Sequence, residues 1–159
     1  LHLVRDPRTF VRSYLNWIYT RWKSYIANKL MFGWHPSGFL TDGISLEEWR
    51  EMGEFERVCW HWAYKNALLE ELFSDHDSYL RLRFEDFYCC GNDTALREFL
   101  TFAGIPYRSR FGKMFQCPKN TSRKTHVGPW SEWCAERKRR LLDICGEGMR
   151  RYGYLDPRE

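Results

Sequence analysis

The sequence has little of what marks several common protein classes. None of its six cysteines forms a Cys-x-x-Cys pair, which argues against a zinc or thioredoxin-like site. No apolar run reaches the length of a membrane span, and no signal-peptide pattern is present in these 159 residues. Internal repeats, low-complexity segments and a Gly-x-x-x-x-Gly-Lys phosphate loop are also missing. What is present is a chain that is 43% hydrophobic and 18% aromatic, enough to bury a core and to argue against disorder.

The start of the sequence also lacks the features of a complete domain. The first residue is Leu rather than Met, and Leu1–Val4 is an apolar segment typical of a buried strand. Tyr79–Phe84, whose residues alternate in polarity, is the only other strand that we expect. A sheet of two strands is marginally stable by itself. We therefore expect residues 1–159 to be the C-terminal part of a single domain whose N-terminal strands, and any targeting segment, are missing.

Charge is distributed unevenly along the chain, although the formal net charge is only +4. Residues 1–41 carry six basic and one acidic residue, and residues 104–159 carry thirteen basic and six acidic residues. Residues 42–86 carry five basic and twelve acidic residues. A fold that brings the two basic segments together would create a positive pocket, which favours an anionic ligand. Nucleic acid is not the expected partner, because nucleic-acid binders usually have a larger overall basic excess.

Periodicity and capping signals predict a mixed α/β order of elements. Asp6-Pro7 is a favourable helix start, and Ser45 with Glu48 forms a capping box. After the first strand we expect a helix from residue 6 to about 29, a loop over 32–44 and a long helix from 45 to about 73. A strand over 79–84 and a helix over 94–103, closed by Gly104, should follow. The rest is expected to be an irregular basic segment over 105–130 and a helix that is capped by Ser131 and ends near Tyr152 and Gly153.

The segment that follows the first strand is a candidate phosphate site. Arg5 lies where that strand ends, and Ser13 lies on the first turns of the next helix. Ligands of open α/β sheets bind beyond the carboxyl ends of strands, and a helix N-terminus favours phosphate. Arg provides a planar fork of donors, and Ser adds a hydroxyl. The alternative is an ordinary strand-to-helix turn with Ser13 at the surface.

Two further segments have residue types that suit a nucleotide. Arg123 and Lys124 are adjacent cations in a loop that continues through Gly128 to Trp130, a pattern that fits a phosphate beside a flat ring. Phe84 ends the second strand and precedes an acidic turn. The alternatives are a solvated basic loop for the first segment and simple packing for the second.

Together these segments resemble the family of sulfotransferases that use 3′-phosphoadenosine 5′-phosphosulfate (PAPS). The helix that contains Trp60-His61-Trp62 and Asn66 is similar to a helix of bacterial and carbohydrate-type members, and all the motifs occur in the family's order over nearly the whole chain. The motifs that carry the resemblance are Arg5-Asp6-Pro7 with Ser13, similar to the family's 3′-phosphate motif, Phe84-Glu85-Asp86, similar to its Tyr-Glu-Asp segment, and Arg123-Lys124-x-x-x-Gly128-x-Trp130, similar to its Arg-Lys-Gly-x-x-Gly-Asp-Trp loop.

The resemblance implies a P-loop-NTPase-like, three-layer α/β fold with a parallel sheet, present here in incomplete form. It also implies transfer of a sulfuryl group from PAPS to a hydroxyl or amine acceptor, such as a saccharide, without a metal ion. By position, Arg5, Ser13, Arg123 and Lys124 would bind the 3′-phosphate of the donor, and Phe84 would lie near its adenine. No catalytic residue is assigned within the chain.

The chain departs from the family's pattern at several positions. Phe84 stands where the family has Tyr and cannot donate a hydrogen bond, and Thr125 and Pro129 replace a Gly and an Asp of the basic loop. The family's 5′-phosphosulfate loop and its catalytic His or Glu both precede the Arg-Asp-Pro segment. We therefore expect these parts to lie ahead of Leu1 and residues 1–159 to be inactive alone.

Two other functions stay open from the residues. A nucleotide kinase-like phosphoryl transferase would need Mg²⁺ and carboxylates to hold it. A non-catalytic module could instead bind a polyanion, either a sulfated glycan or a nucleic acid, through the basic segments. No two of the five histidines have metal-ligand spacing on one helix, so no metal site is expected.

Saccharide, protein tyrosine, lipid and small phenol all stay open as acceptors, because acceptor loops vary within the family. Residues 30–45, which hold three aromatic residues and several glycines, are a candidate acceptor-side loop. His61 could face an acceptor, although packing beside Trp60 and Trp62 is the favoured alternative. The cysteine pattern favours free thiols and with them a cytoplasmic location. An anchor in the missing N-terminal part would instead place the protein in the Golgi lumen.

Overall fold

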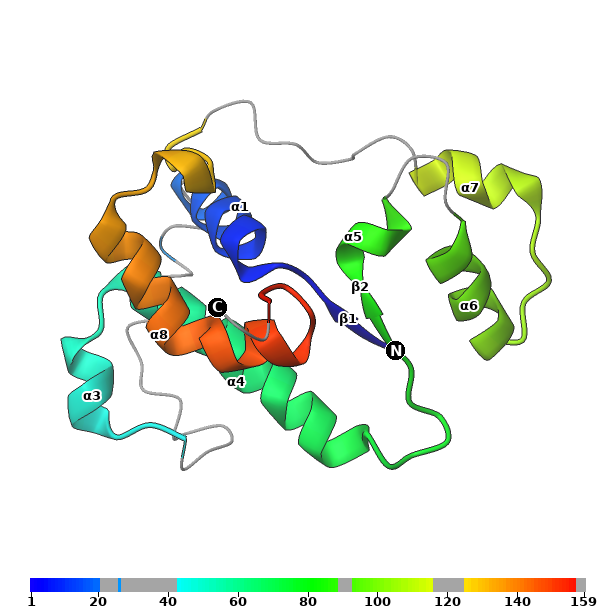
Figure 1. The fold of residues 1–159 in the computed structure, drawn as a ribbon, viewed down its shortest axis with the longest axis horizontal. Coiled ribbons are helices and arrows are strands. Elements are labelled where there is room, and N and C mark those ends of the chain that lie inside the picture. Colours follow the sequence, from blue (N-terminus) through cyan, green and yellow to red (C-terminus); the bar gives the residue numbers. More distant parts are fainter. Residues whose placement is uncertain (21–25, 27–42, 89–92, 116–124, 157–159) are drawn as a thin grey trace. The chain divides into compact units, whose positions relative to one another are not determined.

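The structure is a computed structural model that describes residues 1–20, 26, 43–88, 93–115 and 125–156 (Figure 1). In chain order its elements are β1 (His2–Val4), α1 (Pro7–Thr20), α3 (Leu46–Glu51), α4 (Glu54–Phe73), β2 (Arg81–Arg83), α5 (Phe84–Phe87), α6 (Thr94–Phe102), α7 (Ser109–Phe115), a 3₁₀ turn (Trp130–Glu132) and α8 (Ala135–Arg151). Helices joined to a small parallel sheet agree with the expected α/β organisation.

The chain divides into two compact units. Unit 1 comprises Leu1–Asp6 and Asn66–Thr121, and unit 2 comprises Pro7–Lys65 and Ser122–Glu159. The boundaries fall inside continuous stretches of chain, because Asp6 is followed directly by the first residue of α1 and Lys65 lies within α4. Each unit has its own buried core.

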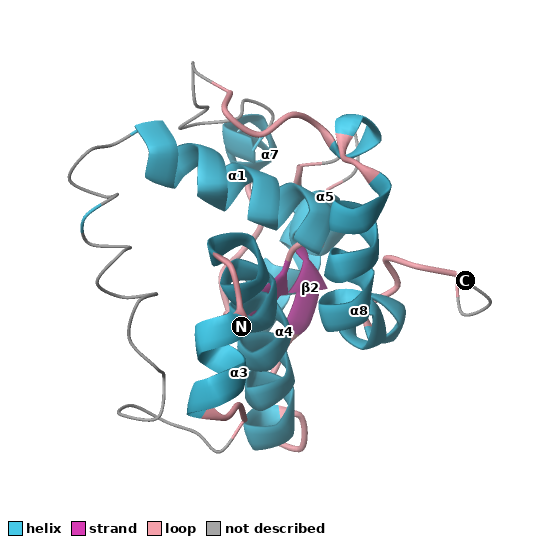
Figure 2. Ribbon diagram, turned by 90° about the vertical axis from the view of Figure 1, so that its left-hand side faces the viewer, coloured by secondary structure: helices cyan, strands magenta, loops and turns pink. Residues whose placement is uncertain are grey.

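Unit 1 is built on the pairing of β1 with β2. The two strands run parallel, with His2 opposite Arg81 and Val4 opposite Arg83, and Figure 2 shows the small sheet in magenta. Side chains alternate between buried and exposed along β1, as expected for a strand with one covered face. The buried core of the unit joins β2 to α5 and α6 and consists of Leu82, Phe87, Ala95, Leu96 and Leu100.

A helix occupies part of the segment that the sequence predicts to be irregular. Residues 109–115 form α7, so the expectation of an irregular segment over 105–130 was wrong there. Packing explains the helix, because Phe111 lies against the unit 1 core and Gly112 lies where a Cβ atom would be 2.9 Å from the carboxylate of Asp93. Gly104 ends α6 at φ 66°, as predicted, in the left-handed region that glycine tolerates best.

Unit 2 is a helical packing of α1 and α8 with α3 and the first part of α4. Leu141, Cys145 and Met149 recur four residues apart along α8 and are fully buried. The Cys145 thiol lies 3.4 Å from the carbonyl oxygen of Cys59 in α4, and a Cβ atom at Gly148 would lie 3.0 Å from the Trp62 ring. Gly148 therefore permits the close approach of α8 to α4.

The long helix predicted from residue 45 to about 73 is in fact two helices. The Ser45–Glu48 capping box is present as predicted and begins α3, but Met52 is extended at ψ 130° and ends it. The side chain of Arg57 donates to the carbonyl of Trp49 at 2.9 and 3.2 Å, which satisfies an acceptor left open at the end of α3. A new helix, α4, begins after Gly53.

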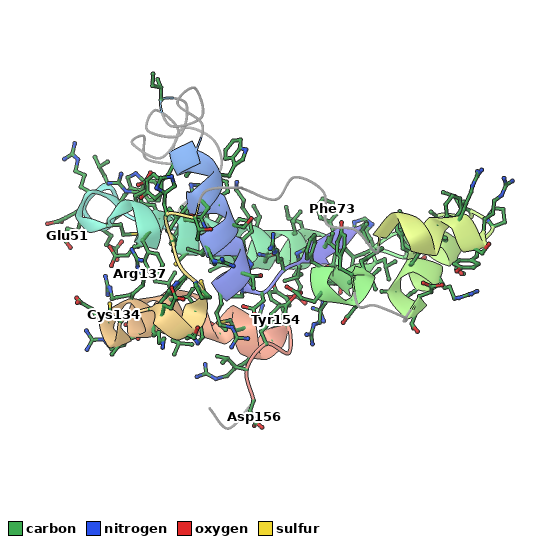
Figure 3. The ribbon with its side chains drawn as sticks, turned by 90° about the horizontal axis from the view of Figure 1, so that it is seen from above. Glu51, Phe73, Cys134, Arg137, Tyr154 and Asp156 are labelled. Atoms are coloured by element: carbon green, nitrogen blue, oxygen red, sulfur yellow. The ribbon has the colours of Figure 1, made fainter. Side chains whose placement is uncertain are left out.

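The last helix begins later than predicted. Ser131 lies in the 3₁₀ turn, and Cys134 is the residue that precedes α8 (Figure 3, where Cys134 and Arg137 are labelled). Trp133 is buried between these elements, and its indole N–H donates to the carbonyl of Gly128 at 2.9 Å. This contact fixes the chain in an extended step between the 3₁₀ turn and the helix. Gly153 follows α8 at φ 73°, as predicted.

Three cysteines lie among the described residues. Cys59, Cys134 and Cys145 are free thiols, and hydrogen bonding to Cys145 together with burial raises the pKa of Cys59 far above its usual range. Among the helices that the structure describes, none is both long and apolar enough to span a membrane. The predicted end of the first helix near Lys29 and most of the candidate acceptor loop, 30–45, lie outside the described residues.

Candidate functional site

The carboxyl ends of β1 and β2 bring together two residues that the sequence singles out. The ladder pairs residue i with residue i + 79 and ends at Val4 and Arg83. The next pair in the same register is Arg5 and Phe84, and the guanidinium carbon of Arg5 lies 4.7 Å from the centroid of the Phe84 ring. This is a cation–π contact, which stabilises a partly exposed pair by about 0.5–1 kcal/mol.

A hydrogen bond continues the same register by one more residue. The backbone N–H of Asp6 donates to Oε1 of Glu85 at 3.0 Å. We call Arg5, Asp6, Phe84 and Glu85 the strand-end cluster. The backbone on both sides of Arg5 is thus fixed, because Val4 belongs to the ladder and Asp6 is bound by Glu85.

Phe84 is expected to end the second strand but instead begins α5. The strand is three residues long, so the prediction of a strand over 79–84 was too long at both ends. The change of backbone at Phe84 starts a helical turn that buries Phe87 in the unit 1 core. The helical turn leaves the half-buried Phe84 ring against Arg5.

The buried face of β1 is anchored by a polar network. His2 is 3% exposed, its Nε2 lies 2.7 Å from Oδ1 of Asn66, and its Nδ1 lies 2.6 Å from the Tyr79 hydroxyl. An amide oxygen only accepts, so Nε2 carries the proton and Nδ1 accepts from Tyr79. Burial lowers the pKa of His2, which keeps the ring neutral.

A cavity of about 420 Å³ opens at the amino end of β1, beside His2. Arg5 follows the other end of the strand, so this cavity is separate from the strand-end cluster. The lining residues are Leu1, His2, Leu69, Phe73 (labelled in Figure 3), His76, Ser78 and Tyr79. None of the predicted site residues is among them.

In unit 2, a buried amide holds the end of the basic loop against α1. Asn16 is 5% exposed, and its Oδ1 accepts the backbone N–H groups of His126 and Val127 at 2.6 and 2.8 Å. Its Nδ2 donates to the carbonyl of Val127 at 3.0 Å, and Nε of Arg12 donates to the same carbonyl at 3.3 Å. We call Arg12, Asn16, His126 and Val127 the helix–loop clamp.

Ser13 lies on α1 within one turn of Asn16 and is exposed. Arg123 and Lys124 lie outside the described residues, but Lys124 is bonded to Thr125, which directly precedes the clamped His126. Unit 2 thus contains both Ser13 and the anchored residues 126 and 127 of the loop predicted to act with it.

The tryptophan at the end of this loop has two cations near its ring. The Arg8 guanidinium carbon lies 5.9 Å and the Lys138 ammonium 5.6 Å from the centroid of Trp130. Arg8 also donates to the carbonyl of Tyr154 at 3.1 Å. These contacts hold the start of α1, the 3₁₀ turn and α8 together within unit 2.

His61 lies inside an aromatic cluster, in agreement with the packing alternative. Its ring lies edge-on to Trp49 and Trp60, at centroid distances of 5.7 and 5.3 Å. Burial, with a smaller contribution from nearby Lys65, lowers the pKa of His61 to about 4. The ring is thus neutral at physiological pH.

Sequence reasoning missed Asn16 and the role of Glu85. Asn16 had no signal, because a single Asn on an amphipathic helix is normally exposed. Glu85 belonged to a recognised motif, and its partner could have been predicted. Parallel pairing of residues 1–4 with 80–83, continued by two residues, places residue 85 opposite residue 6.

Comparisons with protein-family models, with curated proteins and with solved structures gave no significant match. The function is therefore inferred from the geometry of the two units and from the motif resemblance.

Proposed function

We propose that this chain belongs to a sulfotransferase and supplies residues that bind the 3′-phosphate of PAPS. The proposal assigns Arg5, Ser13, Arg123 and Lys124 to that phosphate and Phe84 to the adenine side of the donor, as the resemblance implies. It also includes the finer fold, a three-layer P-loop-like α/β domain of which β1 and β2 are two parallel strands.

The observation that carries the proposal is the Arg5–Phe84 contact at the carboxyl ends of two parallel strands. Ligands of α/β folds bind at this edge of the sheet. A cation beside an aromatic face offers hydrogen-bond donors for a phosphate and a flat surface for a base. Two motifs that are 79 residues apart in the sequence thus supply adjacent side chains.

The helix–loop clamp gives separate support within unit 2. Asn16 ties the segment that follows Arg123 and Lys124 to the helix that carries Ser13. A basic loop that was only solvated would not need a buried anchor of this kind, because its backbone could bind water instead.

In the proposed reaction, the acceptor oxygen or nitrogen forms a bond to sulfur while the bond from sulfur to the bridging oxygen breaks. The electron pair of the broken bond goes to that oxygen, which leaves on adenosine 3′,5′-bisphosphate, and the acceptor proton goes to a base. This chain's residues bind and orient the donor through its 3′-phosphate, away from the reacting atoms. No described side chain is assigned as the base.

Ligand discrimination tests the proposal. The 159-residue chain is titrated with adenosine 3′,5′-bisphosphate, with adenosine 5′-monophosphate and with ATP plus Mg²⁺, by calorimetry at two salt concentrations. We expect the bisphosphate to bind most tightly, because only it carries the 3′-phosphate.

Each other result points to a different function. A preference for ATP with Mg²⁺ would contradict the proposal and favour a kinase-like enzyme. Equal binding of the bisphosphate and the monophosphate, with affinity that falls steeply as salt is raised, would favour a polyanion-binding module.

A further inference from the structure

A backbone donor in the connection from β1 to α1 binds a side chain rather than the sheet. The ladder ends at Val4 and Arg83, and α1 begins at Pro7, which has no N–H group. The N–H of Asp6 lies between these two elements and donates to Oε1 of Glu85 at 3.0 Å. Glu85 therefore extends the connection between the two segments two residues beyond the ladder.

Arg5 lies between the two fixed points. Val4 before it is held by the ladder, Asp6 after it is held by Glu85, and its own side chain lies over Phe84. We infer that Glu85 is a positioning residue that aims Arg5 at the donor's 3′-phosphate, an inference that rests on the proposed function. Glu85 acts through the Asp6 backbone rather than by contact with the ligand.

If Glu85 acts in this way, the length of the side chain at position 85, rather than its charge, determines the affinity for the ligand. A carboxylate near a phosphate site opposes anion binding, so its charge does not help the ligand. The oxygen that accepts the Asp6 N–H does help, and Glu85→Gln keeps an oxygen at the same distance from the backbone. Glu85→Asp keeps the charge but shortens the side chain by one methylene.

The experiment measures the affinity of the full chain for adenosine 3′,5′-bisphosphate and adenosine 5′-monophosphate. The variants are Glu85→Gln, Glu85→Asp and Glu85→Ala. Asp86→Ala is the matched control, because Asp86 is the adjacent exposed carboxylate and its Oδ2 lies 3.9 Å from Nε of Arg83. Arg5→Ala is measured in parallel to test the proposed function itself.

We expect Glu85→Asp and Glu85→Ala to weaken bisphosphate binding about tenfold, the effect of one lost hydrogen bond. Binding of the monophosphate should change less than about twofold, because the monophosphate lacks the 3′-phosphate that the proposal assigns to Arg5. Glu85→Gln and Asp86→Ala should stay within about twofold of the wild type for both ligands. If Glu85 only stabilised the fold, its substitution would weaken the binding of both nucleotides to a similar extent.

The possible failures are distinguishable. If Arg5→Ala leaves bisphosphate binding unchanged, the proposed function fails and the inference falls with it. If Arg5→Ala weakens bisphosphate binding but Glu85→Asp does not, only the inference about Glu85 is overturned. The same conclusion follows if Glu85→Gln weakens bisphosphate binding as much as Glu85→Asp does. If Glu85→Ala does not fold, the Gln and Asp variants decide the question.

Discussion

The strand-end cluster and the helix–loop clamp both hold backbone through a side-chain oxygen, but they differ in how deeply that side chain is buried. The cluster joins two segments by a cation–π contact and by one hydrogen bond from a backbone N–H to a partly exposed carboxylate, in the register that the ladder sets. The clamp uses one buried amide that makes three hydrogen bonds to loop backbone. Losing Glu85 would leave the part-buried Asp6 N–H to bind water, whereas losing Asn16 would leave the buried Val127 N–H without its acceptor. The cluster is thus suited to ligand binding, and the clamp to holding a loop in place.

The largest expected effect follows from removing the clamp. Asn16→Ala should lower the free energy of unfolding by about 3 kcal/mol, because the N–H groups of His126 and of the buried Val127 lose their acceptor, while the Val127 carbonyl keeps only its bond from Arg12. Chemical denaturation measures the loss, and hydrogen exchange of the Val127 amide locates it. Asn16→Asp is the control, and it should lose less because it keeps an oxygen for the two N–H groups. Unchanged exchange at Val127 in Asn16→Ala would contradict the clamp.

Arg5→Ala should mainly affect ligand binding, whereas Asn16→Ala should mainly affect folding stability. We expect it to weaken binding of adenosine 3′,5′-bisphosphate by about 2 kcal/mol, roughly thirtyfold, with little loss of folding stability. The matched control is Arg151→Ala, which removes an exposed arginine paired with Glu147 at 2.9 Å. Isothermal titration gives both affinities. Equal effects of the two substitutions would remove the distinction between the cluster and an ordinary surface cation.

Acid should destabilise the aromatic part of unit 2 through His61. Its pKa is about 4 in the folded chain and 6.5 in the reference state, so the unfolded chain binds the proton first as the pH falls. The contribution of His61 to stability is then complete above about pH 6.5 and declines between about pH 6.5 and 4. Because the ring is only partly buried, we expect a loss of about 1–2 kcal/mol. His61→Gln should reduce this decline, and an unchanged pH profile in that variant would assign the acid sensitivity to other groups.

The sequence predicted the elements whose signals are local. The Ser45 capping box and the glycines at 104 and 153 appear as expected, because caps and left-handed residues depend on a few neighbouring atoms. The break at Met52 and the helix α7 were missed, because Arg57 and Phe111 stabilise them through contacts that periodicity does not contain.

The candidate site was predictable to a similar extent. The residue types at Arg5 and Phe84 indicated a nucleotide, and parallel pairing places them side by side. Asn16 could not be found in this way. It lies off the apolar stripe of α1, and its burial results from a loop that returns more than a hundred residues later.

The most direct test of the central claim is a double-mutant cycle between Arg5 and Arg123. The proposal assigns both side chains to one phosphate, and residues that share a ligand group are energetically coupled. The affinity for adenosine 3′,5′-bisphosphate is measured for Arg5→Ala, Arg123→Ala and the double variant, and again for adenosine 5′-monophosphate. We predict a coupling free energy of about 1 kcal/mol or more with the bisphosphate and none with the monophosphate. Additive losses, or equal losses for the two nucleotides, would contradict the assignment of a shared 3′-phosphate site.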